Sequence, residues 1–223
     1  MNTSLYIKTH RLNLNYSFMI DEELQEQLQF EGLIQGLIQN DYGYCIDFIL
    51  PEIVVGLNAN IQTLLDAEKM KISGIGNNFA YQKDKNIRGD KINWIELSSV
   101  NTFELVYLKK IEKFILYLNK TCFTAINCFE SHYANYETNS FYKRHVDQFK
   151  NEGARQFSIL LYLNDNWLIS DGGMLALYPT GKDQIHISPL GGSLVLFRSA
   201  EMEHEVLPSL TRERRSIAAW LKC

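Results

Sequence analysis

Cysteine and proline are scarce in this 223-residue sequence, which contains four residues of each type. The cysteines (Cys45, Cys122, Cys128 and Cys223) form no CxxC pair, so we expect neither a zinc ribbon nor a disulfide framework. No apolar run approaches the roughly 18 residues of a membrane-spanning helix, and the N-terminal stretch lacks the continuous apolar core of a secretory signal. These absences predict a cytoplasmic protein that does not span a membrane.

Positive charge is also limited, because 22 Lys and Arg face 26 Asp and Glu and give a formal net charge of −4. Proteins that mainly bind nucleic-acid phosphates normally carry an excess of basic residues, so nucleic acid is not the expected partner. With 46% hydrophobic and 22% charged residues, the composition is that of a folded globular chain. The length corresponds to one domain with, at most, a short extension.

Helical periodicity characterises the first half of the chain. Apolar residues at helical spacing predict helices over residues 21–38, 51–67 and 101–118, with Asp21 as the N-cap of the first. The apolar run 44–50 ends at Pro51, which predicts a short buried strand before the second helix.

The second half contains short apolar or alternating runs, separated by Gly, Pro, Asn and Asp, at residues 157–163, 173–178, 185–187, 193–198 and 216–221. Many short strands at near-regular spacing favour a sandwich or barrel over a parallel α/β sheet. No Pro- or Gly-rich linker divides the chain. We therefore predict an α+β fold in which N-terminal helices pack on one side of a jelly roll, also called a double-stranded β-helix.

Two residue types that bind divalent metals occur close together at His145 and Asp147. In an extended strand, residues i and i+2 leave the same face, so the imidazole and the carboxylate would lie side by side. His204 supplies a third candidate ligand. Two His and one carboxylate leave open positions on the metal, as in non-haem Fe(II) oxygenases, where a bidentate 2-oxo acid and O₂ can bind.

The His-x-Asp pattern is a weak signal by itself, and an isolated His is more often an ordinary surface or core imidazole. We apply that interpretation to His10, His132 and His186. What distinguishes His145, Asp147 and His204 is that other residues suited to the same chemistry accompany them. Arg214 follows His204 in a strand-like run, and its planar guanidinium could bind the distal carboxylate of 2-oxoglutarate through two parallel hydrogen bonds. Tyr162 could place its hydroxyl on the same carboxylate.

Three arginines, Arg212, Arg214 and Arg215, compete for this role, and a solvated basic face is the alternative interpretation for all of them. Strand alternation directs Arg214 and Arg215 to opposite faces, so only one of the two can point inward.

Several longer stretches accompany these residues: YETNSFYKRHVD at 136–147, YLN at 162–164, HEVLP at 204–208, and RGDK at 88–91. Together they resemble the 2-oxoglutarate- and Fe(II)-dependent prolyl hydroxylases, and in particular the branch of the hypoxia-inducible-factor hydroxylases and their bacterial relatives. Generic Fe(II) oxygenases lack the RGDK signature. The resemblance extends over about residues 28–221, which suggests an N-terminal extension at 1–27 and an oxygenase domain at 28–223.

The resemblance implies a role for each matching position. The catalytic set would be His145, Asp147, His204 and Arg214, of which the first three would hold Fe(II). The residues that bind or surround 2-oxoglutarate would be Arg214, Tyr162, Tyr136 and Trp220. The substrate-binding residues would be Tyr142, Asp90 and Arg155, with Asp90 and Arg155 paired to link a mobile loop to the barrel mouth. Residues 79–89 would form a lid over a bound peptide.

Two positions depart from the family pattern. The stretch between His204 and the arginine is one residue longer than in several relatives; counting back from Trp220 selects Arg214, whereas counting forward from His204 reaches Glu213. The strand fixes the register near Trp220 and a loop absorbs insertions, so we expect Arg214. Ala218 stands where some relatives have Thr.

The implied activity is a prolyl 4-hydroxylase acting on a protein substrate, which converts 2-oxoglutarate and O₂ to succinate and CO₂, with ascorbate as a candidate reductant. Elongation factor Tu is a candidate substrate, by resemblance to the bacterial relatives. Two alternatives stay open: an oxygenase that acts on another residue or a small molecule, and a non-catalytic module that senses a metal and a 2-oxo acid.

Overall fold

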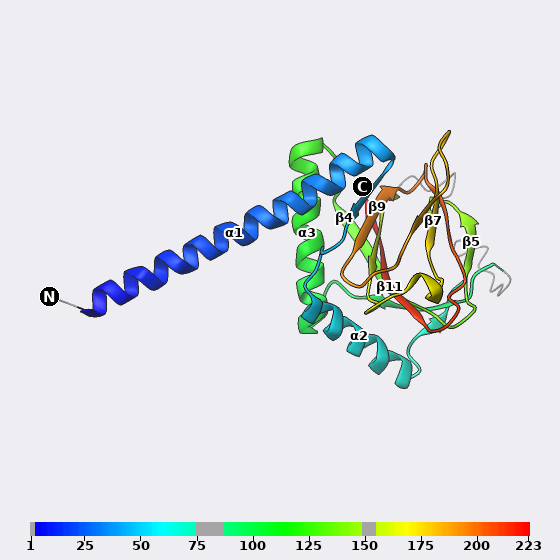
Figure 1. Ribbon diagram of the computed structural model, residues 1–223, viewed down its shortest axis with the longest axis horizontal. Coiled ribbons are helices and arrows are strands. Elements are labelled where there is room, and N and C mark those ends of the chain that lie inside the picture. Colours follow the sequence, from blue (N-terminus) through cyan, green and yellow to red (C-terminus); the bar gives the residue numbers. More distant parts are fainter. Residues whose placement is uncertain (1–2, 75–86, 149–154) are drawn as a thin grey trace.

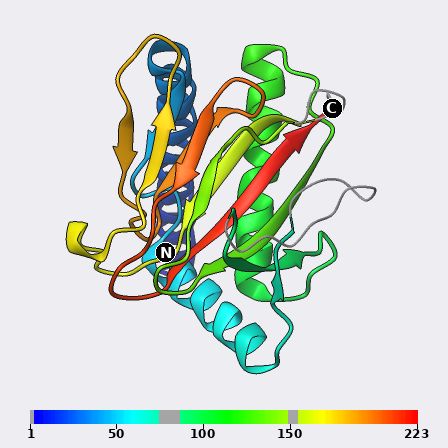
Figure 2. The same ribbon diagram turned by 90° about the vertical axis from the view of Figure 1, so that its right-hand side faces the viewer.

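The computed structural model describes residues 3–74, 87–148 and 155–223. Three α-helices, α1 (Thr3–Asn40), α2 (Pro51–Asp66) and α3 (Thr102–Cys122), lie on one side of two facing β-sheets (Figure 1). Turned by 90°, the molecule shows strands of the two sheets toward the viewer, with the helices α1 and α3 behind the larger sheet (Figure 2). The predicted arrangement, helices packed on one side of a jelly roll, is confirmed.

The larger sheet has seven strands in the order β1-β9-β6-β11-β4-β3-β2, and the smaller sheet has four in the order β5-β10-β7-β8. Every pairing between these strands is antiparallel. The strands are β1 (Tyr42–Cys45), β2 (Lys71–Ile72), β3 (Asp90–Ile95), β4 (Cys128–Tyr136), β5 (Tyr142–His145), β6 (Arg155–Tyr162), β7 (Leu175–Tyr178), β8 (Ile185–Ile187), β9 (Leu194–Arg198), β10 (Glu203–Val206) and β11 (Arg214–Lys222).

The larger sheet separates two apolar clusters. On the helix side, Ile217, Ala219 and Leu221 of β11 pack with buried residues of all three helices. On the opposite side, Tyr136, Tyr162 and Phe197 pack against residues of the smaller sheet. Successive residues of a strand point to opposite faces. The odd-numbered residues of β11 therefore face the helices, and its even-numbered residues face the space between the two sheets.

A close contact between α1 and β1 depends on Gly43, because a Cβ at this position would overlap the carbonyl of Leu33. Only glycine allows the two backbones to approach in this way. β1 ends at Cys45, and residues 46–50 form a turn, so the predicted strand 44–50 is wrong in its second part. The buried residues Phe48 and Ile49 account for the apolar run without a strand.

The helix predicted at 21–38 lies within α1, which begins at Thr3, so Asp21 is not its N-cap. The helices at 51–67 and 101–118 are confirmed as α2 and α3, and Asn101 caps α3 through hydrogen bonds from the N–H groups of Phe103 and Glu104. The five predicted C-terminal strands correspond to β6, β7, β8, β9 and β11. None of the helices in the described ranges combines the length and the apolar character of a membrane span.

Candidate active site

A cavity of about 730 Å³ opens between the two sheets. Its floor consists of side chains that neighbour one another across the larger sheet. One row contains Trp94 of β3, His132 of β4 and Ala218 of β11, and the next contains Ile92, Ala134 and Ser216. Tyr136 and Arg214 form a pair at one end of the floor, and Glu130 and Trp220 form a pair at the other.

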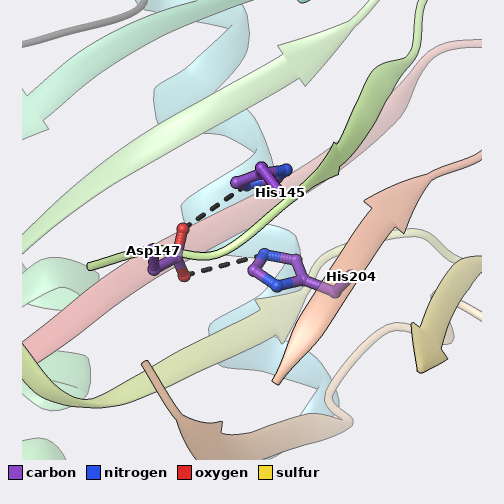
Figure 3. A group of neighbouring side chains, drawn as sticks. All are labelled: His145, Asp147 and His204. Carbon is purple, nitrogen blue, oxygen red and sulfur yellow. Dashed lines mark ion pairs between the residues drawn. The ribbon is translucent and has the colours of Figure 1, made fainter. Parts of the chain in front are cut away.

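His145, Asp147 and His204 come together at this cavity (Figure 3). His145 at the end of β5 and His204 in β10 are partners in the strand register, and their ring centroids lie 4.3 Å apart. Asp147 Oδ1 lies 3.5 Å from His145 Nε2, and Asp147 Oδ2 lies 3.7 Å from His204 Nε2. One ligand atom from each residue therefore lies within 4.8 Å of the other two, which is suitable for a shared metal ion.

Backbone carbonyl groups orient both imidazoles. His145 Nδ1 lies 2.7 Å from the carbonyl oxygen of Lys143, and His204 Nδ1 lies 3.0 Å from that of Met202. A carbonyl oxygen only accepts, so Nδ1 carries the proton in each ring and Nε2 keeps the lone pair that a metal requires. Both Nε2 atoms face Asp147.

The protonation states of this cluster also suit a metal. Burial lowers the pKa of His204 to about 4, so the imidazole is neutral near pH 7. Burial by itself would raise the pKa of Asp147, but the neighbouring His204 and His145 and a hydrogen bond from Ser158 hold it well below its usual range. Metal ligands must be deprotonated to bind, and at neutral pH no proton has to leave either group.

The sequence prediction placed His145 and Asp147 on one face of a single strand. In the structure β5 ends at His145, and Asp147 lies in the following segment, where its N–H donates to the carbonyl of Ser199. The two side chains nevertheless converge, because that segment is attached to the larger sheet.

Arg214 is almost completely buried, with 1% of its surface exposed, and it lines the cavity. Its Nε donates to the carbonyl of Gly173 at 2.9 Å, and its Nη1 donates to Ser216 Oγ at 3.2 Å. Arg214 Nη2 and the Tyr162 hydroxyl are both buried and have no hydrogen-bond partner among the described residues. Burial raises the pKa of Tyr162 to about 12, so its hydroxyl keeps its proton and can donate.

These two unsatisfied donors provide a test of whether a carboxylate fits. The Arg214 Cζ lies 5.1 Å from the ring centroid of Tyr162, so the two groups are neighbours. Leaving buried donors unpaired is costly, and a carboxylate would accept from both. The residues present therefore fit the distal carboxylate of a 2-oxo diacid.

The neighbouring arginines have other partners. Arg215 points to the opposite face of β11, where it donates to Asn135 at 3.2 Å and to Gln62 at 2.7 Å. Arg212 pairs with Asp171. The register counted back from Trp220 thus selects the arginine that lies in the cavity.

The aromatic residues of the predicted site also surround the cavity. Tyr142 stacks on His145 with ring centroids 3.6 Å apart, and Tyr136 lies beside Arg214. The Arg155 guanidinium covers Trp220, with its Cζ 3.8 Å from the ring centroid. Tyr136, Tyr142 and Trp220 all line the cavity, whereas Tyr162 is buried next to Arg214 and is not among the lining residues.

The predicted pairing of Asp90 with Arg155 is not present. Asp90 pairs with Arg88 through two hydrogen bonds of 2.6 and 2.8 Å, and Arg155 pairs with Glu130 at 2.8 Å. Each charge is satisfied by a nearer partner, since Arg88 lies two residues from Asp90. The predicted lid at 79–89 falls outside the described residues except for its last three positions.

Several residues that touch the site were not predicted from the sequence, among them Glu130, His132, Ser158 and Ser199. His132 was expected to be an ordinary imidazole, yet it lies in the cavity between Trp94 and Trp220, with ring centroids 5.1 and 5.3 Å away. Only the pairing of β4 with β11, which places His132 beside Ala218, could have indicated this position.

The match to a known protein family includes the same residues. Residues 131–222 match the model of the 2OG-Fe(II) oxygenase superfamily, and this segment contains His145, Asp147, His204 and Arg214. Human Egl nine homolog 1 is 30% identical over 190 residues, which cover 81% of this chain and 44% of that protein. The hypoxia-inducible factor prolyl hydroxylase of Caenorhabditis elegans is 39% identical over 82 residues, which cover 35% of this chain and 11% of that protein. The chain thus spans less than half the length of these two relatives.

Two solved structures are similar to this chain over a larger share of its length than these relatives. The crystal structure of a Pseudomonas putida prolyl-4-hydroxylase has a TM-score of 0.81 at 29% identity, covering 87% of this chain and 100% of that one. A prolyl hydroxylase of Trichoplax adhaerens, in complex with a hypoxia-inducible-factor peptide fragment, has a TM-score of 0.80 at 26% identity, covering 91% of this chain and 92% of that one. The chain therefore carries a 2-oxoglutarate/Fe(II) oxygenase domain and is homologous to the hypoxia-inducible-factor prolyl hydroxylases.

Proposed function

We propose that this protein is an Fe(II)- and 2-oxoglutarate-dependent dioxygenase that hydroxylates a prolyl residue in a protein substrate. The observation that carries the proposal is the convergence of His145, Asp147 and His204 on a cavity that also contains Arg214. Two homologous solved structures are described as prolyl hydroxylases, and one of them holds a peptide, which supports a protein substrate.

His145, Asp147 and His204 would hold Fe(II), and Arg214 with Tyr162 would hold the distal carboxylate of 2-oxoglutarate. When bound, Fe(II) and 2-oxoglutarate supply the activation of O₂, with one oxygen atom going to succinate and the other to the prolyl C–H bond while CO₂ leaves. The contribution of the chain is to fix these groups relative to one another. Arg214 is anchored by Gly173 and Ser216, so its fork keeps one orientation.

The walls of the cavity determine what reaches the metal. Leu160, Ala218 and Trp220 present apolar surface between the metal ligands and the larger sheet. Such surface excludes water from the reacting groups. Among the lining residues, Trp94 is 46% exposed and Lys71 is also exposed, so a peptide would have both apolar and charged contacts on entry. Elongation factor Tu is our candidate substrate, on the resemblance to bacterial members of the branch.

An anaerobic titration tests the metal and co-substrate sites. We expect the wild-type protein with Fe(II) and 2-oxoglutarate to develop a weak visible charge-transfer band, and the His145→Ala variant to lose it. His186→Ala is the matched control, because His186 is exposed on β8, which β7 separates from the strand that carries His204.

The reaction itself is tested by adding O₂ and proline-containing peptides, including peptides from elongation factor Tu. Succinate release together with the addition of one oxygen atom to a proline, both lost in His145→Ala, is the expected result. A wild-type protein that forms no band with saturating Fe(II) and 2-oxoglutarate would contradict the proposal.

A further inference from the structure

Two buried serines connect the carboxylate of Asp147 to the larger sheet. Ser158 of β6 donates from Oγ to Asp147 Oδ2 at 2.7 Å, and its Oγ lies 2.8 Å from Ser199 Oγ. Ser199 directly follows β9, and its backbone carbonyl accepts from the Asp147 N–H at 3.1 Å. Ser158 is 1% exposed and Ser199 is fully buried, so solvent does not compete for these bonds.

The donor and the acceptor in each of these hydrogen bonds follow from which group supplies the proton. Ser158 Oγ is the donor to Asp147 Oδ2, since a carboxylate oxygen accepts. The single hydroxyl proton of Ser158 is therefore committed to Asp147. It follows that Ser199 donates to Ser158, so protons point along the series Ser199, Ser158, Asp147. Each donor in such a series polarises the next and strengthens its bond.

We propose that Ser158 and Ser199 are positioning residues that hold the Asp147 carboxylate in the orientation that binds the metal. This inference rests on the proposed function. The two imidazoles are each fixed by a backbone carbonyl on their own chain segment. Asp147 lies beyond the end of β5, which belongs to the smaller sheet. The hydrogen bond that orients its carboxylate comes from Ser158 of the larger sheet.

Both carboxylate oxygens face an imidazole of the cluster, and one of them is also held by a serine. Oδ2 accepts from Ser158 and lies 3.7 Å from His204 Nε2, while Oδ1 lies 3.5 Å from His145 Nε2. The hydrogen bond from Ser158 thus restrains the orientation of the Asp147 carboxylate. Partners that orient a metal ligand typically contribute about 10- to 100-fold in metal affinity.

The test is a Co(II) titration of the metal-free protein followed by visible absorption, which reports both affinity and ligand geometry. We expect Ser158→Ala to raise the Co(II) dissociation constant about 10- to 100-fold and to change the spectrum. Ser199→Ala should cause a smaller loss. Because Ser199 acts through Ser158, the double variant should bind Co(II) within about twofold of Ser158→Ala.

Ser193→Ala is the matched control. Ser193 is also fully buried and donates to a backbone carbonyl, that of Leu190, but it does not touch Asp147. Urea unfolding of each metal-free variant measures the purely structural cost. We expect Ser193→Ala to lose unfolding free energy without losing Co(II) affinity. Should Ser158→Ala not fold, the Ser199→Ala variant still provides the affinity and spectral comparison.

Three outcomes would overturn the inference: a Co(II) affinity of Ser158→Ala within twofold of wild type, an equal loss in Ser193→Ala, or additive losses in the double variant. If wild type binds Co(II) and 2-oxoglutarate normally in the same experiments, only the positioning role fails. If wild type binds no metal, the proposed function fails with it.

Discussion

At the residue scale, the site depends on which of two neighbouring arginines faces the cavity. Arg214 and Arg215 differ by one position in β11 and lie on opposite faces of the larger sheet. Arg214 has a buried Nη2 without a partner among the described residues, whereas Arg215 is bound to Asn135, Gln62 and Glu213. Substitution of Arg214 should therefore affect co-substrate binding, whereas substitution of Arg215 should affect only the contacts on the other face of the sheet.

Arg214→Ala should weaken 2-oxoglutarate binding roughly 10- to 100-fold, because charge-assisted hydrogen bonds contribute about 1.5–3 kcal/mol each. Arg215→Ala, one residue away on the other face, should leave the affinity unchanged. Titration of the Fe(II)-loaded proteins with 2-oxoglutarate under anaerobic conditions measures both. Equal losses in the two variants would show that the arginine in the cavity does not bind the co-substrate.

His132 should make stability depend on pH. Burial, followed by the charge of Arg88, lowers the pKa of His132 from 6.5 to about 4. Between these values the unfolded chain takes up a proton and the folded one does not, so this contribution is complete above about pH 6.5 and is lost as pH falls toward 4.

Replacing His132 by Gln removes this proton uptake. The loss of unfolding free energy between pH 7 and pH 4.5, measured by urea denaturation, should be smaller in His132→Gln by about 2 kcal/mol. His186→Gln, which replaces an exposed imidazole on β8, is the control substitution. An unchanged slope in His132→Gln would mean that His132 is already protonated or is solvated in the folded protein.

At the element scale, the helices form a layer whose spacing is set by small residues. Gly56 of α2 is buried against the ring of Phe103 at the start of α3, and a Cβ on Gly56 would overlap that ring. Gly32 of α1 has no atom within 4 Å of the corresponding position. Both glycines are in helices, so the same substitution has opposite expected effects.

Gly56→Ala should lower the free energy of unfolding by about 1–3 kcal/mol, because overpacking outweighs the gain in helix propensity. Gly32→Ala should raise it by roughly 0.5–1 kcal/mol, since only the propensity changes. Urea denaturation of both variants tests the pair. A stabilised Gly56→Ala would show that α2 and α3 can separate without cost.

At the scale of the whole molecule, the C-terminal part of the long helix α1 packs against the body of the protein. Figure 1 shows its first half extending away from the body of the protein. Phe30, Leu33, Ile34 and Leu37 are buried in the helix-side cluster, and Glu26 pairs with Lys113 of α3. The predicted division at residues 27 and 28 stays a prediction, and α1 continues through it without a break.

Deleting residues 1–21 should therefore leave the unfolding free energy and the Co(II) affinity close to those of the full chain. Deleting residues 1–37 removes four buried apolar side chains and should abolish cooperative unfolding, since each core side chain contributes about 1.5–3 kcal/mol. Circular dichroism during urea unfolding measures both. A strong loss in the shorter deletion would place stabilising contacts in the first half of α1.

Much of this site could be anticipated because its signals are local or chemical. His145, Asp147, His204 and Arg214 are residue types with specific chemistry, and the register from Trp220 selected Arg214 among three arginines. The helices followed from apolar periodicity, which reflects one buried face per helix. β3 and β4 escaped prediction because their cavity-facing residues include Glu130, His132 and Trp94, which break the usual apolar alternation.

The sequence by itself determined the metal-binding residue types, the helical layer and five of the short strands in the second half. Only the tertiary structure decided which distant residues touch: Ser158 and Ser199 with Asp147, Arg88 rather than Arg155 with Asp90, and His132 beside Ala218. These contacts depend on strand register and on the packing of one sheet against the other, and neither leaves a pattern within a short stretch of chain.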